Sequence, residues 1–153
     1  MQTPEYSLEK RTHRVLLLDD DVLSGASGAT DPLCALVSQS GQRSGRIVIL
    51  PAAAPDPVDW GRRYARRLLT LGAGLVTVLH VETRSHANDE NAVIVMTQAT
   101  GILMLGDQHE LLTSLLEETE LLRTIRQRQR EGCVIAATRA GYSLLGSGAG
   151  SGL

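Results

Sequence analysis

Five short apolar runs alternate with helical patterns along the chain, and this alternation constrains the fold more than any other feature. Each run is rich in valine, isoleucine or leucine and reads as a strand buried on both faces. The expected strands are Val15–Leu18, Arg46–Leu50, Gly74–His80, Gly101–Leu105 and Cys133–Ala137. The expected helices are Asp31–Ser40, Pro57–Leu71, His86–Gln98 and Leu111–Arg130, the last broken near Glu117 to Thr119. The pattern predicts an α/β fold with a mainly parallel sheet of about five strands and flanking helices.

Composition narrows the classes of protein to which the chain can belong. It has 153 residues, of which 42% are hydrophobic, and a net charge of -2, so it fits one globular domain without a broad basic field for nucleic acid. No apolar run approaches the ~18 residues of a membrane span, and the first ten residues lack the apolar core of a secretory signal. We therefore expect a cytoplasmic protein with no nucleic-acid or membrane partner. The expected layout is a polar extension over 1–13, the α/β domain over 14–145 and a flexible Gly/Ser tail over 146–153.

The sequence does not predict a metal or another cofactor. Cys34 and Cys133 lie in apolar segments and read as buried residues of a reducing compartment rather than as a disulfide or metal ligands. The four histidines lack the spacing of a His-x-x-x-His site. Asp19 to Asp21 follow the first strand, and we interpret them as a cap, because adjacent residues at a strand end do not all point one way.

A strand that runs into a turn of small residues lies between Gly132 and Gly141. A strand, a sharp small-x-Ser-x-small turn and a helix form the nucleophile elbow of α/β hydrolases, although the pattern alone equally describes a plain strand-to-helix connection. Arg139 occupies the central position of this turn, between Thr138 and Ala140. Its guanidinium stays protonated and carries only hydrogen-bond donors, so it cannot attack a carbonyl group.

Four linked motifs add a family resemblance to this pattern. They are Arg84–Glu90, Ala99–Ile102 leading to Gly106-Asp107-Gln108, Leu112–Leu115, and Gly132–Gly141. In this order and spacing they resemble the cyanophycinase family of serine peptidases over roughly residues 14 to 145. The resemblance implies a class-I-amidotransferase-like α/β fold, truncated here because family chains are nearly twice as long.

The resemblance also assigns roles to residues near the strand ends. Cyanophycinases cleave β-aspartyl-arginine units with a serine on the elbow, a histidine from the later half of the chain as base, and a Gly-Gly-Asp-Gln turn at the substrate. Gly106, Asp107 and Gln108 match the end of that turn, whereas Leu105 replaces its first glycine and Arg139 falls on the serine. We therefore expect no catalytic residue, and a site that resembles a substrate-binding site, formed by Gly106, Asp107, Gln108, Thr138 and Arg139. Asp107 and Gln108 can instead be read as a helix N-cap pair.

Two functions follow as expectations. The first is a non-catalytic cyanophycinase-like protein that acts by binding or assembly, and the alternative is a subunit of a β-aspartyl-arginine peptidase whose missing half comes from another chain. A decayed or truncated chain without a function is a third reading. We expect a homo-oligomer, or a hetero-oligomer with a cyanophycinase-like protein, in contact through Val134, Ile135 and the helix around Leu121, Leu122 and Ile125.

A second surface stands out by its charge. Arg62, Arg63, Arg66 and Arg67 form a basic helical face, which we interpret as a solvated face suited to acidic groups rather than to nucleic acid.

Overall fold

The described part of the chain forms a sheet of five strands that all run parallel. The computed structural model describes residues 15–18 and 31–151, with side chains as far as Leu145. The strands are β1 (Val15–Leu17), β2 (Arg46–Ala53), β3 (Leu75–Val78), β4 (Gly101–Gly106) and β5 (Val134–Ala137), in the spatial order β1-β5-β4-β2-β3. The prediction of a five-stranded parallel α/β fold is confirmed, and each predicted strand overlaps an observed one.

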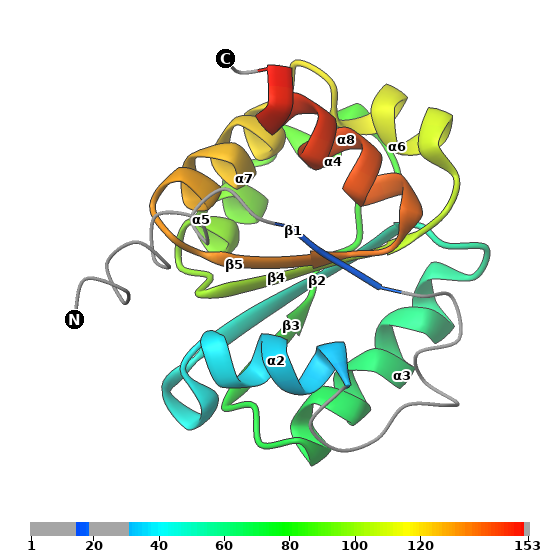
Figure 1. Ribbon diagram of the computed structural model, residues 1–153. Helices are drawn as coiled ribbons and strands as arrows, with labels where there is room; N and C mark the ends of the chain where they lie inside the picture. The colour runs from blue at the N-terminus through cyan, green and yellow to red at the C-terminus, as the bar shows by residue number, and fades with distance from the viewer. Residues whose placement is uncertain (1–14, 19–30, 152–153) are drawn as a thin grey trace.

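Helices cover both faces of the sheet (Figure 1). The described helices are α2 (Pro32–Gln39), the short 3-10 helix η2 (Gln42–Ser44), α3 (Pro57–Thr70), α4 (Arg84–Ala87), α5 (Glu90–Thr97), α6 (His109–Leu116), α7 (Glu120–Arg130) and α8 (Arg139–Ser151). Helices α2 and α3 pack on one face, and α4 to α8 pack on the other. None of the helices in the described part of the chain is long and apolar enough to cross a membrane.

The two faces of the sheet produce two separate hydrophobic clusters. In β2, Ile47 and Ile49 point towards α2 and α3, whereas Val48 and Leu50 point towards the opposite helical layer. All four side chains are buried. This burial on both faces explains why the strands appear in the sequence as continuous apolar runs rather than as alternating patterns.

The segment expected as one helix over His86–Gln98 is instead two helices, and this prediction was wrong. Asp89 is the N-cap of α5 and accepts a hydrogen bond from the backbone N–H of Ala92 at 3.2 Å. Asn88 ends α4, and its amide donates to the carbonyl of Arg84 at 3.1 Å. The two polar residues therefore end one helix and start the next.

The break predicted near Glu117 to Thr119 is confirmed. Glu118 has a left-handed backbone with φ of 61°, which ends the helical path after α6. Thr119 then caps α7 by accepting from the N–H of Leu122 at 3.3 Å. At the other end of the domain, α8 continues through Ser151, beyond residue 145 where composition placed the start of a flexible tail.

The contact surface expected around β5 is wrong in its location. β5 lies between β1 and β4, so it has no free edge. Ile135, Leu121 and Ile125 are fully buried within the chain and belong to the core under α4 to α8. These residues already pack inside the domain and cannot form an interface with another subunit.

Candidate functional site

The predicted site residues meet at the carboxyl ends of two neighbouring strands. Gly106 ends β4 and leads through Asp107 and Gln108 into α6, while Thr138 and Arg139 lead from β5 into α8. β4 and β5 are paired in register up to Met104 and Ala137, and the helices that follow them contact each other. Ligands of parallel α/β sheets bind at this edge.

Gly106 allows the end of β4 to lie unusually close to the end of β2. Its φ is +112°, a conformation that L side chains rarely adopt. A Cβ at this position would lie 1.9 Å from the backbone carbon of Ala53. The N–H of Gln108 then donates to the carbonyl of Ala53 at 3.3 Å, which fixes the turn after β4.

Thr138 joins the ends of β4 and β5. Its side chain is buried, and its hydroxyl donates to the carbonyl of Gly106 at 2.7 Å. Its backbone N–H donates to the carbonyl of Met104 at 3.0 Å. Within the described residues, Thr138 therefore positions the strand ends, and its buried hydroxyl does not face solvent.

The turn between β5 and α8 has the strand-turn-helix geometry that the small residues predict. Ala140 is fully buried against the sheet. A Cβ on Gly141 would lie 2.9 Å from the Cβ atoms of Ala137 and Met104, so the start of α8 packs tightly on β4 and β5. We call this turn, residues 137–141, the corner.

Arg139 is the first residue of α8 and the exposed residue of the corner. The structure describes no hydrogen bond or ion pair for its guanidinium within residues 15–18 and 31–145. It therefore presents a fixed positive charge, with five N–H donors, at the carboxyl edge of the sheet. The positive ends of the α6 and α8 dipoles lie at the same edge and add to the attraction for an anion.

Asp107 and Gln108 supply the complementary polar groups. Both side chains are exposed, and Gln108 occupies the N-cap position of α6. The interpretation of the two residues as a capping pair holds for the position of Gln108 only, because its side chain makes no cap hydrogen bond. A carboxylate and an amide therefore lie at the same edge of the sheet as Arg139, and neither side chain makes a hydrogen bond or ion pair among the described contacts.

The family-like motif at Arg84–Glu90 has an architectural role that sequence reasoning did not assign. Asn88 accepts a hydrogen bond from the N–H of Glu120 at 2.9 Å, which connects the α4–α5 junction to the start of α7. Arg84 donates to the carbonyl of Ser114 in α6 at 3.0 Å. The motif thus holds together the helices on the face of the sheet that also carries α8.

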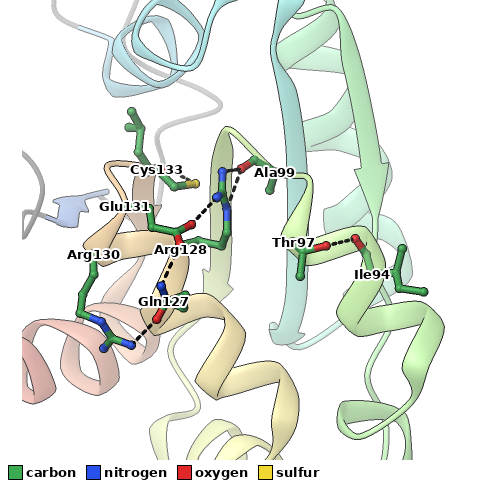
Figure 2. Close-up of polar contacts among 9 residues, drawn as sticks. Ile94, Thr97, Ala99, Gln127, Arg128, Arg130, Glu131 and Cys133 are labelled. Atoms are coloured by element: carbon green, nitrogen blue, oxygen red, sulfur yellow. Dashed lines mark hydrogen bonds and ion pairs between the residues drawn. The ribbon is translucent and has the colours of Figure 1, made fainter.

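A polar cluster at the opposite edge of the sheet is also structural (Figure 2). Arg128 donates through Nε and Nη2 to the carbonyl of Ala99, at 3.1 and 2.6 Å, and through Nη1 to Glu131 at 2.6 Å. Hydrogen bonds from Gln127 and Arg128 lower the pKa of Glu131. The cluster attaches the end of α7 to the residues that lead into β4, and its donors are directed at the protein itself.

The remaining nucleophilic and metal-binding candidates do not form a second centre in the described part of the chain. Burial raises the pKa of Cys133 to about 11, so its thiol stays neutral, and it precedes β5 at the end opposite to the corner. Ser143 is exposed on α8, one turn after Arg139. No three His, Cys, Asp or Glu side chains of the described segments meet in a way that could hold a metal ion. Asp19 to Asp21 lie outside the described residues.

A parallel α/β sheet with a sharp strand-turn-helix corner at its carboxyl edge is the architecture in which α/β hydrolases present their nucleophile. Residues 22–149 match the model of peptidase family S51, and the chain belongs to this family.

The similar proteins are considerably longer than this chain. Cyanophycinases of Nostoc sp. and Trichormus variabilis are 29% identical over 154 residues, which cover 95% of this chain and 52% of theirs. The cyanophycinase of Synechococcus elongatus is 34% identical over 101 residues, covering 65% of this chain and 31% of that protein. The crystal structure of a peptidase from an acI-B1 Actinobacterium shares the fold, with a TM-score of 0.62 at 19% identity, over 86% of this chain and 57% of the other. The chain thus spans about half the length of the cyanophycinases of Nostoc sp. and Trichormus variabilis.

Proposed function

We propose that this chain is a non-catalytic member of peptidase family S51 that binds a carboxylate-bearing peptide at the corner. The observation that carries the proposal is the exposed Arg139 at the first position of α8. From the family resemblance we expect the nucleophilic serine of active relatives to correspond to this position. A guanidinium at the same place cannot act as a nucleophile, but it can bind a carboxylate, to which arginine donates two parallel hydrogen bonds.

The neighbouring side chains suggest the class of ligand. Asp107 can pair with a cationic group, Gln108 can donate and accept hydrogen bonds, and Arg139 can pair with a carboxylate. A β-aspartyl-arginine unit carries both a carboxylate and a guanidinium, so it complements this set. In this function the chain acts with a cyanophycinase-like partner, which makes it one component of a hetero-oligomer.

A second candidate function is a subunit of an active β-aspartyl-arginine peptidase. The intact corner favours it, since the close packing at Gly141 preserves the geometry that an elbow needs. In that case another chain has to supply the histidine base and also a nucleophile, because Arg139 provides none. This double requirement favours the binding function.

Isothermal titration calorimetry with β-aspartyl-arginine, combined with chromatography of the same samples, tests the proposal. We expect binding without hydrolysis, and we expect Arg139→Ala to weaken binding at least about tenfold, since a charge-assisted hydrogen bond contributes about 1.5 to 3 kcal/mol. Arg43→Ala is the matched control, because Arg43 is an exposed arginine of η2, which directly precedes β2 at the opposite edge of the sheet.

Two outcomes contradict the binding function. The first is equal affinity of the Arg139→Ala and Arg43→Ala proteins. The second is hydrolysis by the purified chain that survives repurification and disappears in Ser143→Ala. We also expect Arg139→Ser to remain inactive, because a serine without a base is a weak nucleophile.

A further inference from the structure

β3 forms an open edge of the sheet. Among the described strands it pairs with β2 only, and it lies at the margin of the sheet in Figure 1. The N–H groups of Leu75 and Leu79 donate to the carbonyls of Gly45 and Ile49 on the β2 side, at 3.2 and 2.8 Å. Because successive residues of a strand alternate in direction, the N–H and C=O groups of Val76 and Val78 point away from β2. They form a ladder ready to pair with another strand.

Helix α3 extends over the space beside this edge. Gly61 brings the helix onto β3 so closely that a Cβ there would lie 2.7 Å from Val78. On a helix with 3.6 residues per turn, Val58, Ala65 and Leu69 then lie on the flank turned away from α2. Arg67 lies on the opposite flank, where it bonds to Asp31 at the start of α2. The flank that carries Val58, Ala65 and Leu69 therefore lies above the empty position that a strand beyond β3 would occupy.

A groove of about 700 Å³ runs along this flank of α3 and the end of β3. Its lining includes Val58, Leu69 and Val78. Val58 and Leu69 are 53% and 52% exposed, and Leu75 at the start of β3 is 53% exposed. Apolar side chains thus line a trough beside unpaired backbone groups, which is the combination that recognises extended peptides.

The charge of the groove indicates what it accepts. Arg62 and Arg66 line it, and the described residues supply neither guanidinium group with an ion pair or a hydrogen bond. The other two arginines of the basic face are engaged, Arg63 with Asp59 at 3.4 Å and Arg67 with Asp31 at 2.9 Å. Two unpaired guanidinium groups beside an apolar trough are suited to carboxylates on a bound segment.

We infer that this groove binds an extended acidic segment of a partner protein, which adds a sixth parallel or antiparallel strand beside β3. Because alternate side chains of a strand lie on opposite faces, every second side chain of the segment faces α3. Apolar side chains on that face pack against Val58, Ala65 and Leu69, and carboxylates on the same face pair with Arg62 and Arg66. A second copy of the chain is the less favourable occupant, because a two-fold axis at β3 would bring the same arginines of both copies together. The inference is independent of the ligand proposed for the corner.

Fluorescence anisotropy tests this inference with a short labelled peptide in which every second residue is serine and the positions between the serines are alternately valine and glutamate, so that one face of the strand carries both. We expect the peptide to bind at least tenfold more tightly than its valine and lysine counterpart. Leu69→Ser and the double variant Arg62→Glu/Arg66→Glu should each weaken binding at least tenfold. Ile94→Ser and Arg43→Glu are the matched controls, because they change an exposed apolar residue of α5 and an exposed arginine outside the groove.

Hydrogen exchange measured by NMR locates the bound peptide. The amides of Val76 and Val78 should become protected when it binds, whereas the amide of Gln108 near the corner should not change. Three results would overturn the inference: no binding of the glutamate peptide, equal binding of both peptides, or no change in protection at β3. A dimer of the free chain that Leu69→Ser dissociates would overturn it in favour of a second copy.

Discussion

Individual residues around the corner separate into those that build it and one that faces outwards. Thr138 and Gly141 set the distance between β4, β5 and α8, and Gly106 lets the backbone of β4 approach β2. Arg139 contributes to none of this packing, because its side chain is exposed. The residues that build the corner are therefore distinct from the residue that we propose binds a ligand, and substitutions at these positions should have different consequences.

Gly106→Ala should destabilise the protein far more than Gly132→Ala. Both glycines have positive φ, of 112° and 98°, so each substitution should cost about 1 to 2 kcal/mol in backbone strain. At Gly106 the new Cβ would also meet the backbone of Ala53 at 1.9 Å, whereas nothing lies within 4 Å at Gly132. Urea unfolding of both variants measures the difference. Similar losses of unfolding free energy in the two variants would contradict this prediction, because they would show that β4 can shift away from β2 to make room for the new methyl group.

Cys133 should resist alkylation in the folded protein. Burial raises the pKa of its thiol from 9.0 to about 11, so almost no thiolate is present at pH 8. Mass spectrometry after treatment with iodoacetamide should find modification mainly at the half-buried Cys34, with Cys133 reacting as the pH approaches 11. Equal modification rates of the two cysteines at pH 8 would contradict this expectation.

The same thiol links stability to pH. The folded pKa lies above the unfolded one, so the contribution of the neutral thiol to stability is fully present below pH 9 and is lost as the pH rises towards 11.

At the scale of elements, side chains at helix ends determine where helices start and which neighbours they join. Asp31 is fully buried at the N-cap of α2, and one of its oxygens accepts from the N–H of Leu33 at 2.9 Å. Its other oxygen accepts from Arg67 of α3 at 2.9 Å. One carboxylate thus caps a helix and joins it to the next one.

Asp31→Ala should therefore cost more stability than Asp89→Ala, which removes a cap alone. We expect a loss of about 2 to 3 kcal/mol at Asp31, from a cap of about 1 kcal/mol and a charge-assisted hydrogen bond of about 1.5 kcal/mol or more. Asp89 caps α5 without a recorded ion pair, so about 1 kcal/mol is expected there. Thermal and urea unfolding of the two variants provide the comparison, and equal losses would mean that the bond to Arg67 adds nothing.

Sequence predicted the elements well wherever local pattern decides them. The strands appear as apolar runs because both faces of the sheet are buried, and the break before Thr119 appears because a cap residue follows two glutamates. The break at Asn88 was missed although local contacts form it, because the amide of Asn88 donates to the carbonyl of Arg84 and Asp89 accepts from the N–H of Ala92. A local sequence pattern does not contain the bond from the N–H of Glu120 to Asn88, whose partners lie 32 positions apart.

At the scale of the whole molecule, strand order was the information that the sequence did not provide. The apolar character of β5 shows that it is buried but not which elements bury it, so its place between β1 and β4 could not be predicted. Within the described residues the edge strands are β1 and β3, and β3 lies next to a helical face whose basic character the sequence did show. The residues of the candidate site were predictable because the carboxyl ends of parallel strands share one edge, whatever their order.

The position of Arg139 outside the packing has a consequence for how this family can diversify. Since the corner is maintained by Thr138, Ala140 and Gly141, the residue between them can change without a large penalty in folding free energy. A substitution of this one residue can therefore change the chemical group at the corner while the fold stays the same. The corner therefore fixes the place of residue 139 in the fold without fixing the chemistry of its side chain.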